Sequence, residues 1–202
     1  MKRTCFTSLS VLILSCAQAQ LLDGLKIKHY ETALQDVMEL IDTTEVKLKL
    51  TQMEDAVLRE PTELNKVRLG IIYHETALNL GFLTKTRYKG YSKKSYDLLS
   101  ELCLNRQTTK ELLPFISAYR ASALSLQGAE TMKMSLVGDA FKLFDESVKL
   151  YSSYCSAPEF LRASVAENLP WFFFSFKKFA KKDMQSIVDK QERQGDFAPA
   201  GT

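Results

Sequence analysis

The chain has 202 residues, of which 46% are hydrophobic and 25% are charged. This length supports one domain with a core of ordinary size and is too short for several large domains. Twenty-seven Lys and Arg against 24 Asp and Glu give a net charge of +3, and the two signs are interspersed along the chain. Because a phosphate backbone requires a dense basic face, we expect no nucleic-acid partner.

The first residues have the three parts of a secretory signal peptide. Two basic residues are followed by an apolar stretch over 6–14, and Ala17-Gln18-Ala19 fits a cleavage site of the Ala-x-Ala type. The apolar stretch is too short for a stable transmembrane helix. We therefore expect residues 1–19 to be removed and the remaining protein to reside in the periplasm or cell envelope of a bacterium.

The cysteines leave two questions open. Ile13-Leu14-Ser15-Cys16 is similar to a lipoprotein signal, and in that interpretation Cys16 is acylated and tethers the chain to a membrane. Cys103 and Cys155 remain in the chain after signal cleavage. An oxidising compartment would allow them to form a disulfide, but the sequence is equally consistent with two separate thiols.

Over residues 20–190, apolar side chains recur every three or four positions and no alternating strand pattern persists. This periodicity predicts one all-α domain. In chain order we expect a first helix near 30–41, a connecting segment to about residue 60, and helices over 61–81, 91–102, 108–128, 138–150, 156–170 and 172–189. Residues 191–202 contain Gly and Pro, and we expect them to form a disordered tail.

An internal repeat is the most informative pattern in this domain. Apolar residues of one long helix recur 46 positions later in another: Leu69, Tyr73, Ala77, Leu78 and Leu80 match Phe115, Tyr119, Ala123, Leu124 and Leu126. We expect Leu78 and Leu124 to be core residues. Each helical hairpin of such a repeat exposes an apolar face that only a neighbouring hairpin can cover, which predicts a short α-solenoid.

The repeat resembles the tetratricopeptide repeat (TPR). Leu69-Gly70-x-x-Tyr73 keeps the spacing of the first-helix motif of that family, and Gly138-Asp139-Ala140 with Phe144 is similar to the second-helix motif. The period here is near 46 residues instead of the usual 34, and the early Trp of the family motif is absent. The resemblance implies a TPR-like fold, a short right-handed α-solenoid of antiparallel helical hairpins.

In tetratricopeptide proteins the first helices of the hairpins line a concave face. The resemblance therefore implies that Tyr73, His74, Tyr119 and Arg120 lie in a groove that binds a protein or peptide. His74 and Arg120 occupy equivalent repeat positions, from which they would contact acidic groups of the bound segment, since Arg can bind a carboxylate through two hydrogen bonds. A simpler interpretation places both residues on a solvated helix surface.

The residue types that covalent chemistry needs are scarce. The chain has only two His, and it contains no Cys-x-x-Cys pattern and no Gly-rich phosphate loop. We therefore expect no enzyme activity, no metal and no cofactor. The alternative function is an accessory small-molecule or lipid-binding protein, whose apolar pocket between helices would be lined by Tyr73 and Tyr119.

The segment Trp171–Phe179 contains most of the aromatic residues near the C-terminus. On a helix, Phe172, Phe176 and Phe179 share one face and the lysines that follow occupy the other. This pattern favours a terminal helix that seals the open end of the solenoid. A second interpretation is peripheral membrane association, because aromatic rings and lysines suit the membrane interface.

Overall fold

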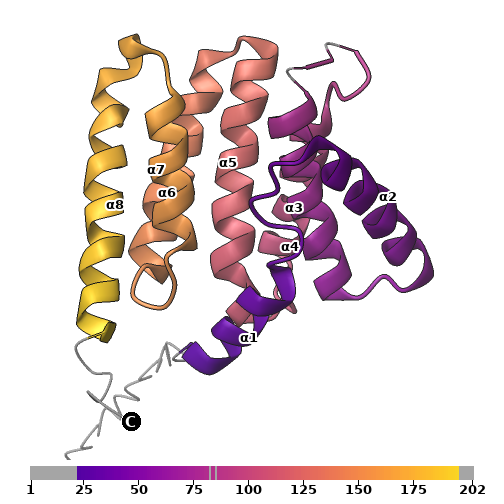
Figure 1. Ribbon diagram of the computed structural model, residues 1–202, viewed down its shortest axis with the longest axis horizontal. Coiled ribbons are helices and arrows are strands. Elements are labelled where there is room, and N and C mark those ends of the chain that lie inside the picture. The colour runs from indigo at the N-terminus through magenta and orange to yellow at the C-terminus, as the bar shows by residue number, and fades with distance from the viewer. Residues whose placement is uncertain (1–21, 82, 85, 196–202) are drawn as a thin grey trace, which may run out of the picture.

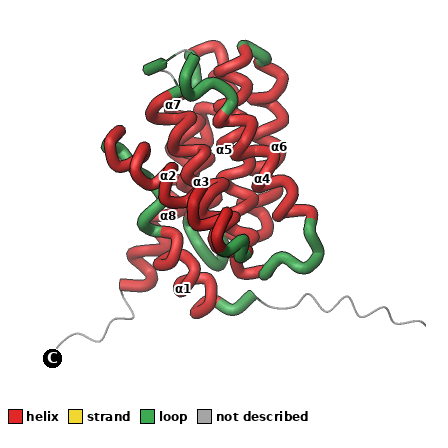
Figure 2. Tube along the Cα trace, turned by 90° about the vertical axis from the view of Figure 1, so that its right-hand side faces the viewer, coloured by secondary structure: helices red, strands yellow, loops and turns green. Residues whose placement is uncertain are grey.

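The computed structural model describes residues 22–81, 83–84 and 86–195 (Figure 1, Figure 2). These residues form helices and turns without a β-strand, which confirms the predicted all-α class. The predicted signal peptide with Cys16, and residues 196–202 of the predicted tail, lie outside the described residues. The helices are α1 (Gly24–Leu34), α2 (Thr43–Arg59), α3 (Glu63–Leu80), α4 (Tyr91–Leu104), η1 (Lys110–Leu112), α5 (Leu113–Thr131), α6 (Met134–Tyr151), α7 (Ala157–Asn168), η2 (Trp171–Phe173) and α8 (Phe174–Gly195).

The structure differs from the predicted helices at two places. Residues 43–59, which we expected to connect two helices, form the 17-residue helix α2. Its buried residues Val46, Leu50 and Met53 form one stripe, and the carboxylate of Asp42 caps its first turn. At the other end, α8 continues to Gly195, beyond the expected start of the tail at residue 191.

Helices that follow one another in the chain pack side by side. This holds for α2 with α3, α3 with α4, α4 with α5, α5 with α6, α6 with α7, and α7 with α8. In addition, α3 contacts α5 and α5 contacts α7, so these three helices form a continuous row (Figure 1). Among the described residues, no helix combines the length and the hydropathy that a membrane span requires.

The C-terminal aromatic segment divides between core and surface. Phe176 stacks on Phe141 of α6 with the ring centroids 4.2 Å apart, and Phe179 lies 5.8 Å from the same ring. Trp171 and Phe172 are exposed. Our prediction that Phe172 shares a helix face with Phe176 and Phe179 is wrong, because the 3-10 turn η2 precedes α8 and displaces Phe172 from that face.

Helices α3 and α4 approach closely at Gly70. The hydroxyl of Ser95 donates to the Gly70 carbonyl at 2.7 Å. A Cβ added to Gly70 would lie 2.5 Å from Cδ2 of Leu99, a side chain that is fully buried. The glycine of the Leu69-Gly70-x-x-Tyr73 motif therefore permits the close contact between these two helices.

A buried charge cluster attaches α8 to α7. Nε and Nη2 of Arg162 donate to the two carboxylate oxygens of Asp183, both at 2.7 Å. Nη1 of Arg162 donates to Asp145 of α6 at 2.5 Å. Arg162 and Asp183 are buried, whereas Asp145 is largely exposed. Because two N–H groups of the guanidinium must align with the two carboxylate oxygens, this pair favours one position of α8 along α7.

We expect Gly70→Ala to lower the free energy of unfolding by about 1 to 3 kcal/mol, because the new methyl group overlaps Leu99. Gly138→Ala is the matched control, since Gly138 also lies within a helix but has no atom within 4 Å of an added Cβ. That change should raise the free energy of unfolding by roughly 0.5 to 1 kcal/mol. Urea denaturation followed by far-UV circular dichroism measures both. Equal changes in the free energy of unfolding of the two variants would contradict the close approach of the helices at Gly70.

Asp183→Asn should lower the free energy of unfolding by about 3 kcal/mol or more, because it leaves the charge of Arg162 buried without a full counter-charge. Asp145→Asn removes the exposed partner of the same guanidinium and should change stability by less than about 1 kcal/mol. Guanidinium denaturation of the two variants tests this difference. A similar loss of unfolding free energy in both variants would mean that the buried and the exposed carboxylate contribute equally to stability.

Candidate binding groove

A groove follows the row of α3, α5 and α7, and the segment between α1 and α2 forms one edge. Its main pocket has a volume of about 590 Å³. We call this pocket the central groove. Its lining consists of Glu39, Leu40 and Ile41, of His74, Glu75, Leu78 and Asn79 from α3, of Ser122, Ser125, Leu126 and Ala129 from α5, of Phe160, Leu161, Ser164, Val165 and Asn168 from α7, and of Leu169 and Pro170.

A hydrogen-bonded network at the central groove joins α3 to α5. Nε2 of His74 lies 2.7 Å from the hydroxyl of Ser122, and Nδ1 lies 3.2 Å from a carboxylate oxygen of Glu75. His74 is only 2% exposed, and the ring of Tyr119 packs edge-on against it with the centroids 5.1 Å apart. A carboxylate can only accept hydrogen bonds, so Nδ1 of a neutral His74 carries the proton and Nε2 accepts from Ser122.

Ser122, His74 and Glu75 stand in the order of a nucleophile, a base and an acid in a catalytic triad, which the scarcity of His does not predict. Acyl transfer also requires donors aimed at the developing oxyanion. Ser122 lies inside α5, where the backbone N–H groups are used by the helix. The amide of Asn79 donates to the carbonyl groups of Leu40 and Glu75. The network is therefore best explained as a satisfied polar contact between two helices.

The charged side chains that line the central groove are both acidic. Glu75 is 2% exposed, and Glu39 lies at the exposed rim. Partial burial and the nearby carboxylates of Glu75 and Glu31 raise the pKa of Glu39. Burial and the carboxylates of Glu75 and Glu39 also raise the pKa of Tyr119 well above its usual value. Among the described residues that line this pocket there is no Lys or Arg, so its charged lining is acidic.

Glu39 is held in an uncommon backbone conformation. Its φ of 56° lies in the left-handed region, which residues other than glycine rarely adopt. The amide of Asn79 donates to the carbonyl of the next residue, Leu40, at 2.9 Å and fixes the segment on α3. Glu39 also lines two smaller hollows that adjoin the central groove. Strained positions of this kind concentrate at functional sites, so Glu39 is a candidate binding residue.

Ser125 offers a hydrogen-bonding group that the protein itself does not use. The residue is 6% exposed and lines the central groove. Its hydroxyl has no hydrogen-bond partner among the described residues. Among the described residues, Nε of Arg68 is the side-chain polar atom that is fully buried without a partner, so the hydroxyl of Ser125 is accessible from the groove. Ser125 is therefore available to form a hydrogen bond with a polar group of a ligand.

Two of the predicted groove residues, Tyr73 and Arg120, face away from the central groove. The hydroxyl of Tyr73 donates to Glu54 of α2 at 3.3 Å, and burial together with this carboxylate raises the pKa of Tyr73 to about 12. Nε of Arg120 donates to Ser100 of α4 at 3.0 Å, and the guanidinium lies 5.7 Å from the ring of Tyr96. Neither residue lines the central groove, and each contacts a neighbouring helix instead.

The other two predicted residues lie nearer the groove. His74 contributes to the central groove, and Tyr119 lines the adjoining hollow next to α8. Both are buried, so His74 is not on a solvated surface. The two tyrosines contact different helices, since Tyr73 donates to Glu54 of α2 and Tyr119 packs on His74 of α3. Leu78, which we expected in the core, is 45% exposed at the groove, whereas Leu124 is buried.

The cysteines and acidic residues provide no further chemistry at this site. Cys103 and Cys155 are both free thiols. Burial raises the pKa of Cys155 to about 11, which keeps this thiol protonated at neutral pH. Within residues 22–195, apart from the two undescribed positions, no three His, Cys, Asp or Glu side chains are placed to hold a metal ion.

Ser122→Ala should lower the free energy of unfolding by about 1 to 3 kcal/mol, because Nε2 of His74 then remains buried without a partner. Ser125→Ala is the matched control on the same helix face. Since its hydroxyl makes no hydrogen bond within the protein, this change should alter stability by less than about 0.5 kcal/mol. Thermal and urea unfolding distinguish the two. A large loss in Ser125→Ala would show that this hydroxyl has a structural partner.

Comparisons with protein-family models, with curated proteins and with solved structures find no match to this chain. The resemblance to tetratricopeptide repeats therefore stays a prediction from the residues that carry it.

Proposed function

We propose that this protein is a non-enzymatic binding protein of the cell envelope, which holds a protein or peptide segment in the central groove. The observation that carries the proposal is the row of α3, α5 and α7, whose successive turns line one groove. Side chains on packed helices are already ordered before binding. Less conformational entropy is therefore lost when a flexible segment is bound.

The same row supports a TPR-like solenoid as the architecture. In this proposal α3 with α4, α5 with α6, and α7 with α8 are successive antiparallel hairpins of a short right-handed array. The first helix of each hairpin contacts the first helix of the next. A partner would then lie along the three first helices, as the resemblance implies.

The charge of the groove favours a cationic segment. Glu39 and Glu75 are its charged lining residues, and apolar side chains such as Leu126 and Phe160 surround them. A Lys, an Arg or a free amino group would reduce the repulsion between the two carboxylates while its apolar neighbours fill the pocket. This reverses our expectation of an acidic ligand, which depended on Arg120.

A small molecule is the second candidate ligand, because the volume of the central groove falls within the range of about 300 to 1,000 Å³ that is usual for ligand pockets. The same chemistry would then select an apolar compound with an amino group. Binding of such a compound at micromolar concentration, without any selected peptide, would favour this candidate.

A random peptide library presented to the purified chain should yield binders with a Lys or Arg beside apolar residues. Glu39→Gln should weaken the selected peptides about threefold to fivefold, because one partly screened charge interaction is removed. Glu167→Gln removes the same charge at an exposed position of α7 outside the central groove and serves as the control. Fluorescence polarisation measures the affinities.

Two outcomes of this experiment would count against the proposal. The first is a set of binders with no preference for basic residues. The second is an equal effect of Glu39→Gln and Glu167→Gln, which would remove the central groove from the binding site. As a stronger change, Leu78→Arg places a cation on an exposed groove position and should abolish binding while leaving thermal stability nearly unchanged.

A further inference from the structure

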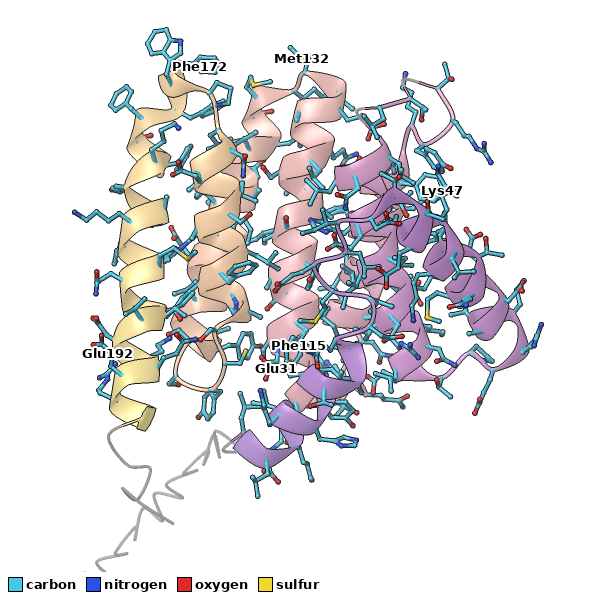
Figure 3. The ribbon with its side chains drawn as sticks, in the orientation of Figure 1. Glu31, Lys47, Phe115, Met132, Phe172 and Glu192 are labelled. Atoms are coloured by element: carbon cyan, nitrogen blue, oxygen red, sulfur yellow. The ribbon has the colours of Figure 1, made fainter. Side chains whose placement is uncertain are left out.

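The α3–α4, α5–α6 and α7–α8 connections lie at one end of the molecule (Figures 1 and 2), and large exposed apolar side chains stand in or next to them. Trp171 is 81% exposed and Phe174 is 77% exposed. Phe172, Leu83 and Met132 are exposed as well, and Figure 3 shows Phe172 and Met132 at the same end. We call these five side chains the apolar tip. Three neighbouring exposed aromatic rings indicate an interaction surface.

Basic side chains surround the apolar tip. None of them forms an ion pair with another described residue. The acidic residues nearest to these connections in the chain are Glu130, whose carboxylate is used within the protein, the exposed Glu167, and Asp139, which forms an ion pair with Lys142. The rim of the tip is therefore positive. Its basic residues are Arg87, Lys89, Lys133, Lys177 and Lys178.

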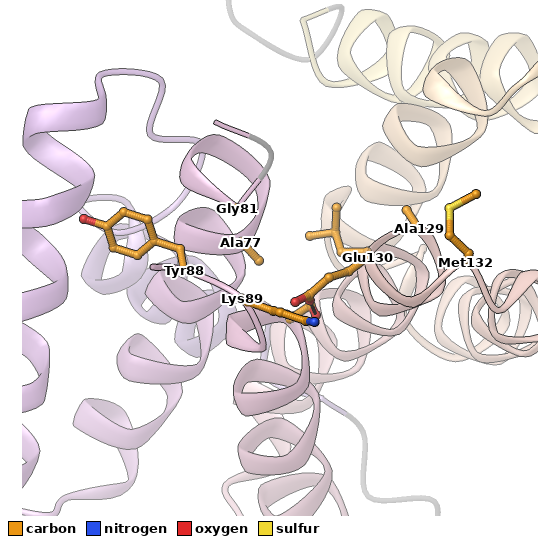
Figure 4. A pocket seen from close by; sticks show the side chains of 9 residues that line it. Ala77, Gly81, Tyr88, Lys89, Ala129, Glu130 and Met132 are labelled. Carbon is orange, nitrogen blue, oxygen red and sulfur yellow. Dashed lines mark hydrogen bonds between the residues drawn. The ribbon is translucent and has the colours of Figure 1, made fainter. Parts of the chain in front are cut away.

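Contacts between the helices hold the tip in a fixed arrangement. The carboxylate of Glu130 at the end of α5 accepts hydrogen bonds from the backbone N–H of Gly90 and the hydroxyl of Ser92. This attaches the α3–α4 connection to α5, on one side of a pocket of about 490 Å³ (Figure 4). Nζ of Lys177 donates to the Glu167 carbonyl at 3.2 Å and attaches the start of α8 to α7.

We propose that this end of the molecule docks on an anionic lipid surface, with the apolar tip among the headgroups and the basic rim facing lipid phosphates. Trp and Phe are favourable at the boundary between headgroups and acyl chains, and each Lys or Arg near an anionic surface adds attraction. An apolar contact with a protein would account for the rings but not for a surrounding set of cations without counter-charges.

Docking in this orientation also has a consequence for the groove. Leu169 and Pro170 line the central groove and directly precede Trp171 in the chain. A molecule bound through the apolar tip therefore holds one end of the central groove beside the membrane surface. The lipid interaction depends on none of the groove residues. Its test is therefore independent of whether the central groove binds the proposed ligand.

Trp171 is the only Trp of the chain, so its fluorescence reports on the tip and not on residues 1–19. Phosphatidylglycerol vesicles added to the full chain should shift the Trp171 emission to shorter wavelength, and brominated acyl chains should quench it. Phosphatidylcholine vesicles should bind at least about tenfold more weakly, because the attraction of the basic rim is absent.

The double variant Phe172→Ser, Phe174→Ser keeps Trp171. Its affinity for phosphatidylglycerol vesicles should be lower by about tenfold or more. Leu25→Ser is the matched control. Leu25 is 85% exposed on α1, at the opposite end of the molecule (Figure 1), and its loss should leave binding unchanged. Circular dichroism verifies that both variants remain folded, as expected for exposed positions.

Three results would overturn the proposal. The first is Trp171 emission that does not change with phosphatidylglycerol vesicles. The second is an equal response to both lipids. The third is a shift without vesicles that grows with protein concentration, which would assign the apolar tip to a contact with a second copy of the chain.

Discussion

The burial of most of α5 between other helices is the constraint on which the rest of the structure depends. This helix contacts α3, α4, α6, α7 and η1. A helix with buried residues on most of its faces must be covered by several other elements, so α5 determines where the helices before and after it lie. Small residues allow the close approach: Ala121 is fully buried, and a Cβ added to Gly128 would lie 3.1 Å from Val137 of α6.

Polar groups within this helical packing have two different functions. The contacts of His74 with Ser122 and of Arg162 with Asp183 satisfy buried polar groups and so select one arrangement of neighbouring helices. Ser125 differs because it lines the central groove and its hydroxyl makes no hydrogen bond to another described residue. The structure therefore separates the groups that define the fold from those available to a ligand.

The candidate site was predictable only in part, and the reason is helical geometry. The repeat relates His74 to Arg120, 46 positions apart, yet the groove positions of α3 and α5 differ by 47. One residue turns a helix face by about 100°, so Arg120 contacts α4 while the next positions approach the groove. The matching pairs along the groove are Glu75 with Ser122, Leu78 with Ser125, and Asn79 with Leu126.

By itself, the sequence determined the all-α class and the approximate ranges of the helices after residue 61, because apolar periodicity and turn residues act over a few neighbouring positions. Only the tertiary structure decided that Glu39 and Glu75 share one groove and that Trp171 is exposed while Phe176 is partly buried against Phe141. These outcomes depend on how each helix is rotated against partners distant in the chain, and local patterns do not specify that rotation.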